Sequence, residues 1–272
     1  MKKIDLRKRL PTSIVLLSFV FLCVQFFSPL LFFLILQALI FATLLEFYNL
    51  ASKRGLRPQK TFGIVLSLIV GISFYFESFS LELAFFISLL LAALYFVLSI
   101  NKIEKLPGFP SSIALTLFGP LYISFTLNFF FPLREQEGPF IIYFLFAVIF
   151  LGDTGAFVIG KLFGRHKLAP VASPKKTWEG SFGGIFIACL GGILAQQVLL
   201  HNMPLWKAIL LAFLVHAVAQ ISDPLESLFK RAAGVKDSSN LLPGHGGFFD
   251  RVDSLILAAP FLYFLVKYVG IE

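Results

Sequence analysis

Long uncharged runs separated by short polar segments dominate the hydrophobic pattern of this chain. The first run covers residues 10–45 without a charged side chain. As one helix it would be roughly 54 Å long, well beyond a membrane core of about 30 Å. We therefore expect a turn at Ser28-Pro29 that divides it into two spans. Further uncharged runs follow at 61–76, 83–101, 106–133, 138–152, 180–206, 208–222 and 254–266.

These runs predict an all-α polytopic membrane protein with about nine transmembrane helices. The composition agrees, because 58% of the 272 residues are hydrophobic and 14% are charged, whereas soluble domains carry about 25% charged residues. With the N-terminus in the cytoplasm, all of the 23 lysines and arginines except Arg134, Lys207 and Lys267 lie on the cytoplasmic side. The positive-inside rule then puts the C-terminus outside. We expect a multi-pass protein of the cytoplasmic membrane.

The net charge of +8 follows mostly from this asymmetry and favours anionic lipid headgroups. Nucleic-acid binding is not expected, because the basic residues are spread over five loops without an aromatic–basic module. Polar chemistry concentrates in the second half of the chain. We interpret residues 1–135 as supporting, lipid-facing helices, with Glu46 as an ionisable exception, and residues 136–272 as the part that carries the catalytic site.

Two pairs of acidic residues flank the second long cytoplasmic loop. Asp223 and Glu226 are three positions apart at the end of one helix, and Asp250 and Asp253 are three apart at the start of the next. Helical spacing places each pair on one face, and a hairpin would bring the pairs together. Clustered carboxylates need a cation, and oxygen ligands favour Mg²⁺. The alternative is ordinary helix caps and ion pairs, such as Glu226 with Lys230.

Basic and glycine-rich segments accompany these acids. The segment "SPKKTWEG" (173–180) places two lysines before a helix that starts at Thr177, an arrangement that can hold a polyphosphate. In "PGHGG" (243–247) the glycines let the backbone approach a ligand, and His245 is expected to contact phosphate. Asp153 lies deeper in an apolar run. It is either a third arm of the site or half of a buried ion pair with a lysine.

Two segments resemble the phosphatidate cytidylyltransferases, also called CDP-diacylglycerol synthases. One is "SLFKRAAGVKDSSNLLPGHGGFFDRVDS" (227–254), which matches the family signature at thirteen positions, and the other is 152–184. The matching positions are Ser227, Lys230, Arg231, Lys236, Asp237, Pro243, Gly244, His245, Gly246, Gly247, Asp250, Arg251 and Asp253. The chain departs from the family at Ser222, where glycine is usual.

The resemblance implies that CTP and phosphatidate react to give CDP-diacylglycerol and pyrophosphate. It also implies Asp223 and Asp250 as ligands of Mg²⁺, with Asp253 nearby, and a second cation such as K⁺. The residues expected to be catalytic are Asp223, Asp250, Asp253, Lys230 and His245, of which the three aspartates would bind metal. The residues expected to bind substrate are Lys175, Lys176, Arg231, Lys236, Gly244, Gly246, Gly247, Arg251 and Asp153.

Three other functions stay open at this point. Another CTP-dependent lipid enzyme, such as a polyprenol kinase, would transfer the γ-phosphate instead. An ion-coupled transporter could use intramembrane acids as a relay, although no paired broken helices are visible in the two halves. A structural scaffold has no use for clustered Asp, Lys, His and Gly. The expected partners are CTP and phosphatidate, and a homodimer is a further possibility.

Overall fold

The computed structural model describes residues 6–242 and 246–270, and it describes side chains from residue 14 onward except that of Val269. Gly244 and His245, both predicted to be site residues, lie outside these ranges. The chain divides into two compact units. Unit 1 comprises Met1–Phe131 and Ala232–Arg251, and unit 2 comprises Pro132–Arg231 and Val252–Glu272.

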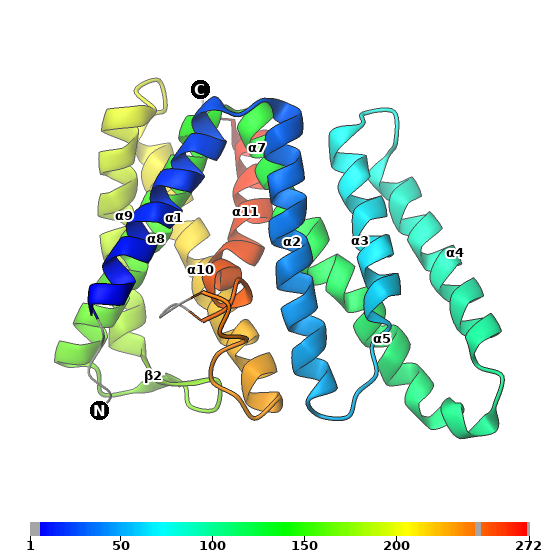
Figure 1. Ribbon diagram of the computed structural model, residues 1–272. Coiled ribbons are helices and arrows are strands. Elements are labelled where there is room, and N and C mark those ends of the chain that lie inside the picture. The colour runs from blue at the N-terminus through cyan, green and yellow to red at the C-terminus, as the bar shows by residue number, and fades with distance from the viewer. Residues whose placement is uncertain (1–5, 243–245, 271–272) are drawn as a thin grey trace. The chain divides into compact units, whose positions relative to one another are not determined.

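Helices form almost all of the regular structure (Figure 1). Each uncharged run of the sequence lies mainly within one helix or a series of helices, so the prediction of an all-α chain is confirmed. In chain order the helices are α1 (Leu6–Phe26), α2 (Pro29–Ser52), α3 (Lys60–Tyr75), α4 (Leu81–Ser99), η1 (Ile103–Gly108), α5 (Phe109–Gly119), η2 (Pro120–Ser124), α6 (Phe125–Asn128), α7 (Phe130–Glu135), α8 (Pro139–Phe163), α9 (Trp178–Leu199), α10 (Leu205–Ala232) and α11 (Phe249–Val269).

Local signals set the helix boundaries. The predicted turn at Ser28-Pro29 separates α1 from α2, because the Ser28 hydroxyl caps α2 by accepting from the Leu31 N–H at 3.4 Å. Ser80 caps α4 in the same way through the Leu83 N–H at 3.3 Å. In the predicted span at 106–133, a π-helical turn begins at Pro120, which lacks the N–H that a regular helix needs.

A two-stranded antiparallel hairpin interrupts unit 2 between α8 and α9. Strands β1 (Lys167–Ala169) and β2 (Ser173–Thr177) pair with Lys167 opposite Thr177, and the register is irregular between Lys167 and Ala169. The sequence indicated only a long cytoplasmic loop here. Thr177 does start a helix as predicted, since its hydroxyl accepts from the Gly180 N–H at 3.2 Å.

Small residues let the helices of unit 2 pack closely. A Cβ added to Gly184 on α9 would lie 2.8 Å from the Cβ of Ala156 on α8. One added to Gly152 on α8 would lie 2.4 Å from the ring of His216 on α10, which is fully buried. No larger side chain fits at these glycines without displacing a neighbouring helix. Gly152 directly precedes Asp153, so this packing also fixes the position of that carboxylate.

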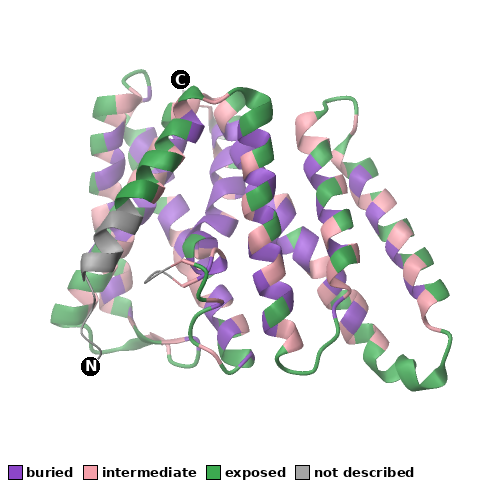
Figure 2. Cartoon of the chain, in the orientation of Figure 1, coloured by how far each residue is buried: buried purple, intermediate pink, exposed green. Residues whose placement is uncertain are grey.

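Six helices in the described part of the chain are long and apolar enough to cross a membrane. They are Pro29–Ser52, Leu81–Ser99, Ile103–Glu135, Pro139–Phe163, Trp178–Leu199 and Leu205–Ala232. Many of their large apolar side chains are exposed, and helix faces exposed in this way run along both units (Figure 2). The chain is therefore a mainly helical, multi-pass membrane protein.

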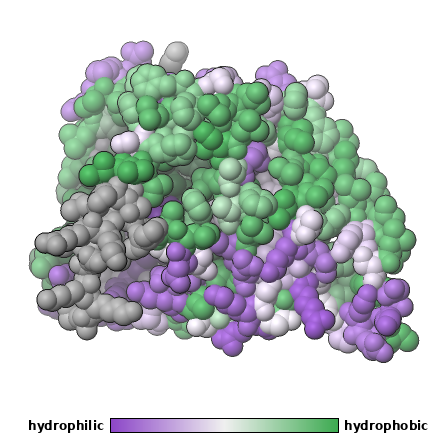
Figure 3. Space-filling view, viewed as in Figure 1, coloured by the Kyte–Doolittle hydropathy of each residue, from purple (hydrophilic) through white to green (hydrophobic). Residues whose placement is uncertain are grey.

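Charge gathers at one end of the helices of unit 1. The visible surface over α3 and α4 is hydrophobic, and hydrophilic residues collect where α2 joins α3 and where α4 joins η1 (Figure 3). These two connections carry Arg54, Arg57, Lys102 and Lys105. They are the connections that the charge pattern assigns to a single side of the membrane.

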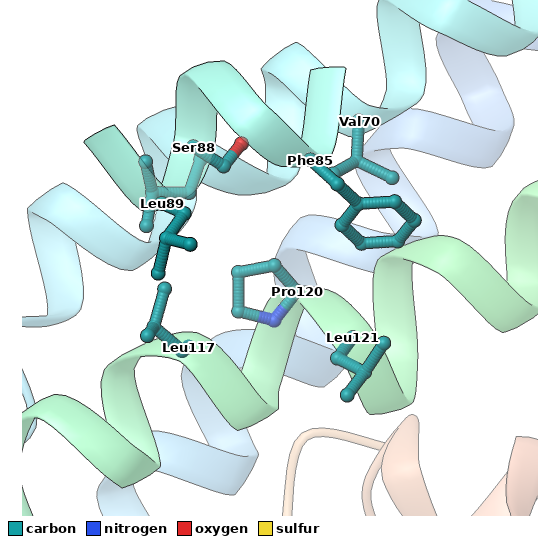
Figure 4. A pocket seen from close by; sticks show the side chains of 8 residues that line it. Val70, Phe85, Ser88, Leu89, Leu117, Pro120 and Leu121 are labelled. Carbon is teal, nitrogen blue, oxygen red and sulfur yellow. The ribbon is translucent and has the colours of Figure 1, made fainter. Parts of the chain in front are cut away.

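An apolar cavity of about 240 Å³ lies within unit 1, between α3, α4 and the α5–η2 segment (Figure 4). Its lining consists of Leu66, Val70, Phe85, Ser88, Leu89, Leu117, Pro120 and Leu121. This lining contains no charged group, so the cavity offers nothing that would hold a phosphate or a cation.

Candidate active site

The acidic residues predicted on α10 lie on one face of that helix. Asp223 is half-buried, and Glu226 and Lys230 are buried at its last two turns. The Glu226 carboxylate accepts from the Lys230 ammonium at 2.6 Å, which confirms the i,i+4 ion pair considered for these two residues. Because the pair is almost fully buried, each partner needs the other to remain charged.

Asp223 forms an ion pair with a lysine of the hairpin. The ammonium Nζ of Lys176 lies 2.7 Å from Oδ2 of Asp223, and the two side chains are 27% and 25% exposed. Strand alternation turns the neighbouring Lys175 away, and its side chain is exposed. Of the two lysines predicted to hold a polyphosphate, β2 therefore directs only Lys176 to the aspartate.

The hairpin that carries Lys176 is anchored to the start of α9. Glu179 accepts from the Arg165 N–H at 3.0 Å and lies 2.6 Å from Nδ1 of His166. These contacts join the segment after α8 to the first turn of α9, so the hairpin is held at its base, where β1 begins and β2 ends. Glu179 was predicted only as part of a helix start, and its role as an anchor follows from the fold.

Asp153 and Asp253 complete the acidic cluster of unit 2. Asp153 interacts electrostatically with Lys176 and Asp223, and Asp253 interacts with Asp223, Asp153 and Lys230. The Ser254 hydroxyl donates to Oδ2 of Asp153 over 3.5 Å, while the Ser254 N–H donates to Oδ1 of Asp253 at 2.7 Å. Asp153 thus lies within electrostatic range of a lysine and of the other acids, and both alternatives for it stay predictions.

Ser222, where the resembling family usually has glycine, has a structural role. Its hydroxyl donates to the backbone oxygen of Asp253, and it also accepts from the Leu257 N–H at 3.4 Å. It is buried and has ordinary helical geometry, since no non-glycine residue in the described ranges has positive φ. The serine therefore ties α10 to α11 beside Asp253 without straining the backbone.

Asp250 belongs to unit 1 and is bound there by backbone and hydroxyl donors. Its Oδ2 accepts from the Ser238 N–H at 2.8 Å, the Ser238 hydroxyl at 2.7 Å and the Gly247 N–H at 2.9 Å. It lies in the first turn of α11, as predicted. Helix α11 passes from unit 1 to unit 2 after Arg251, and the predicted meeting of Asp250 with Asp223 stays a prediction.

The two glycines before α11, Gly246 and Gly247, lie against the carboxylates of Asp250 and Glu46. Gly246 has φ +79, a backbone conformation that favours glycine, and an added Cβ would lie 2.7 Å from Oδ2 of Asp250. A Cβ on Gly247 would lie 2.2 Å from both Oε2 of Glu46 and the Ser238 hydroxyl. Close approach of the chain's own carboxylates accounts for both glycines, whereas their predicted contact with phosphate stays a prediction.

Three further basic residues were predicted as phosphate contacts. Arg231, Lys236 and Arg251 are all exposed in the structure. Exposure leaves their charges accessible to an anion, and their contacts with substrate stay predictions. The serines at positions 238, 239 and 254 were missed by the sequence analysis, because serine carries no pattern that distinguishes a site from a helix surface.

The donor set of unit 2 suits a hard cation. Asp153, Asp223 and Asp253 are oxygen donors of like charge within electrostatic reach of one another, and such donors favour Mg²⁺ over zinc. No three His, Cys, Asp or Glu side chains of residues 6–242 and 246–270 are already close enough to hold a metal ion. The chemistry of the residues therefore fits a cation, while the set of ligands stays a proposal.

Comparison with known proteins defines the class. The family model described as "Cytidylyltransferase family" matches residues 7–269, and the chain belongs to this family. Proteins named phosphatidate cytidylyltransferase are similar to it. One from Staphylococcus epidermidis is 39% identical over 177 residues, which cover 65% of this chain and 68% of that protein.

Two other staphylococcal proteins of the same name show a similar match. The protein from Staphylococcus aureus is 37% identical over 177 residues, covering 65% of this chain and 68% of its own length. That from Staphylococcus haemolyticus is 37% identical over 172 residues, covering 63% and 64%. The family resemblance seen in the two motifs is confirmed, and the chain is a CTP-dependent nucleotidyltransferase.

Proposed function

We propose that this chain is a phosphatidate cytidylyltransferase that converts CTP and phosphatidate to CDP-diacylglycerol and pyrophosphate. The similarity to three proteins of that name supports the choice of substrates. The observation that carries the proposal is the half-buried Lys176–Asp223 pair with the half-buried acids Asp153 and Asp253 in electrostatic range. Such a cluster provides both a cation for phosphate and oxygen ligands for a metal.

In the proposed reaction a phosphate oxygen of phosphatidate forms a bond to the α-phosphorus of CTP. The bond from that phosphorus to the bridging oxygen of the β-phosphate breaks, and pyrophosphate leaves with the electron pair. The attacking oxygen is already an anion, so no strong general base is required. The protein must align two anions and offset their charge.

Lys176 is the residue best placed to offset that charge in unit 2. Its ammonium is held by Asp223 and remains 27% exposed, so a phosphate can reach it without breaking the ion pair. Lys175, Arg231, Lys236 and Arg251 are proposed as further phosphate contacts because their charges are exposed. Lys230 is proposed to act on the site through the charge that it shares with Glu226 and Asp253.

A divalent cation, with Mg²⁺ as the proposed ion, would neutralise charge on the phosphates when bound. Asp223 and Asp253 are its proposed ligands in unit 2, with Asp153 as an additional carboxylate nearby. The predicted contribution of Asp250 stays a prediction, as does a second cation such as K⁺. Asp153 is proposed to adjust the charge of the cluster, and its predicted contact with substrate stays a prediction.

The proposed topology has nine crossings of the cytoplasmic membrane. Helices α1, α3 and α11 would add to the six candidate spans, and the shorter apolar helices Ile14–Phe26 and Lys60–Tyr75 support two of these additions. The N-terminus would be cytoplasmic and the C-terminus outside, as the charge pattern predicts. The site would then face the cytoplasm, where CTP is present. A homodimer stays a prediction.

The proposal is tested with purified protein in phosphatidate-containing micelles supplied with labelled CTP and Mg²⁺. We expect label from the α-phosphate to enter the lipid fraction, with one pyrophosphate released per lipid labelled. Label from the γ-phosphate should remain in the aqueous phase. Transfer of the γ-phosphate to lipid would contradict the proposal and favour a kinase.

A further inference from the structure

Glu46 is a buried carboxylate that the proposed chemistry does not use. It lies on α2 with 3% of its surface exposed. Its Oε1 accepts from the Ser239 hydroxyl at 2.7 Å and the Phe248 N–H at 3.1 Å. Its Oε2 accepts from the Ser238 hydroxyl at 2.8 Å and the Phe249 N–H at 2.9 Å. Four donors therefore hold this one carboxylate in place within unit 1.

The contacts place the charge at the beginning of α11. The N–H groups in the first turn of a helix have no partner inside the helix, and they create a partial positive charge. The amides of Phe248 and Phe249 both point to Glu46, so the carboxylate caps this helix from a distant part of the sequence. Charge-assisted hydrogen bonds of this kind are stronger than neutral ones and compensate for burying the charge.

One hydroxyl connects Glu46 to Asp250. The Ser238 oxygen lies 2.8 Å from Oε2 of Glu46 and 2.7 Å from Oδ2 of Asp250. Gly247 lies against the same atoms, where any side chain would collide with Glu46 and Ser238. The position of Asp250 is thus determined through Ser238 and Gly247 by a residue about two hundred positions earlier in the chain.

Unit 1 also binds the beginning of the segment that connects α10 to α11. Nε of Arg54, which lies in the connection between α2 and α3, donates to the carbonyl oxygen of Ala232. Gly234 has φ +72, and an added Cβ would lie 3.2 Å from Nη2 of Arg54. Arg54 and Glu46 therefore bind the two ends of segment 232–249, which carries several residues of the family signature.

We propose that Glu46 is a positioning residue that, together with Arg54, clamps segment 232–249 and sets the place of the Asp250 carboxylate. The inference rests on the proposed function in one respect, since its second test also takes Asp250 as a ligand of the cation, as the sequence predicts. The clamp itself requires no substrate. It gives the N-terminal half of the chain, whose role was predicted to be support, a defined part in building the site.

The matched variants are Glu46→Gln and Thr43→Val. Glutamine keeps the shape but replaces one acceptor oxygen with an NH₂ group, which in either orientation faces two of the four donors. Thr43 is equally buried one turn earlier on α2, and its hydroxyl donates only within the helix, to Leu39 at 2.8 Å. Ser239→Ala is a milder third variant, since it removes one donor and leaves the carboxylate in place.

Hydrogen–deuterium exchange of the purified protein without substrate is the first measurement. We expect the amides of Ser238, Gly247, Phe248 and Phe249 to exchange at least about tenfold faster in Glu46→Gln than in Thr43→Val. Ser239→Ala should change in the same direction by less. Equal exchange rates in Glu46→Gln and Thr43→Val would overturn the clamp. If Glu46→Gln does not fold, Ser239→Ala decides, and exchange rates as slow as those of the unmodified chain would overturn the clamp.

The second measurement is the Mg²⁺ concentration that gives half-maximal CTP turnover. Loss of an outer partner of a metal ligand typically costs about 10- to 100-fold in metal affinity or activity, so Glu46→Gln should require at least about tenfold more Mg²⁺. Thr43→Val should match the unmodified chain. Faster exchange with an unchanged Mg²⁺ requirement would overturn the positioning role. If the unmodified chain does not turn over CTP, the proposed function fails, and exchange alone decides the clamp.

Discussion

The two carboxylate clusters of this protein are surrounded by different kinds of partner. In unit 1, six backbone N–H and serine hydroxyl donors lie 2.7 to 3.1 Å from the carboxylate oxygens of Glu46 and Asp250, and the two carboxylates share the Ser238 hydroxyl. In unit 2, Asp153, Asp223 and Asp253 face a lysine and one another. Both clusters contain acids in an apolar chain, but only the first is largely satisfied by neutral donors.

This difference is the one expected between a carboxylate that stabilises the fold and one proposed to bind a ligand. A carboxylate with several backbone donors is stabilised where it is, and its charge is already compensated. Carboxylates that interact with each other are stabilised by an added cation, so binding one is favourable. The number and type of partners thus support the proposals that Glu46 positions the chain and that Asp223 takes part in the chemistry, although both are acids on apolar helices.

The largest effect is expected when the charge in unit 2 is removed. Asp223→Asn should lower CTP-dependent turnover by about 10³-fold or more, because it removes both the partner of Lys176 and a proposed cation ligand. Lipid labelling from α-labelled CTP measures the change. Ser227→Ala is the control, since it removes a hydroxyl that lies 3.5 Å from Oδ1 of Asp223 and leaves the carboxylate itself in place. Equal activity in both variants would contradict a role of Asp223 in the reaction. It would also mean that the two clusters do not differ in function as proposed.

The adjacent lysines of β2 provide a matched pair for the next effect. Lys176→Met should reduce turnover on the order of 10²-fold, because its ammonium offsets phosphate charge beside Asp223. Lys175→Met changes the same net charge at an exposed position and should cost less than about tenfold. Steady-state rates at saturating CTP compare them. Equal losses would mean that total loop charge, rather than the geometry of the hairpin, matters.

A third prediction concerns the crowded cluster of unit 1. Gly247→Ala should destabilise the protein by about 1–3 kcal/mol, because the added Cβ would lie 2.2 Å from Glu46 and Ser238. Gly108→Ala is its control, since nothing lies within 4 Å of a Cβ there. Thermal unfolding in detergent measures the difference. A Gly247→Ala variant as stable as the control would show that the carboxylates of unit 1 can move, against the positioning role.

The sequence was sufficient to predict the features that hydrophobic periodicity and neighbouring residues determine. Uncharged runs located the helices, Ser28-Pro29 marked a turn, and Thr177 marked a helix start. Glu226 and Lys230 were correctly considered as an ion pair because both partners lie on one helix. In each case the cause lies within a few residues of the effect.

The long-range partners could not be predicted in this way. Glu46 was visible as the only charged residue between Arg9 and Lys53, yet nothing local indicates that it meets Phe248 and Phe249. The adjacent lysines looked equivalent until strand pairing turned one toward Asp223. Contacts between distant segments depend on the packing of whole helices, and packing leaves only a weak trace in one sequence.

The smallest effect is expected at Ser222, the departure from the family pattern. Ser222→Ala removes the hydroxyl that joins α10 to the Asp253 carbonyl, at a cost of about 1 kcal/mol. Ser222→Gly restores the usual residue and should cost about 1 kcal/mol more, because glycine is unfavourable inside a helix. Thermal unfolding and turnover are measured for both variants, with turnover expected to stay within about threefold. A large loss of turnover in Ser222→Ala at preserved stability would show that the hydroxyl orients Asp253 for catalysis. The acids of unit 2 would then resemble those of unit 1 in depending on a neutral donor.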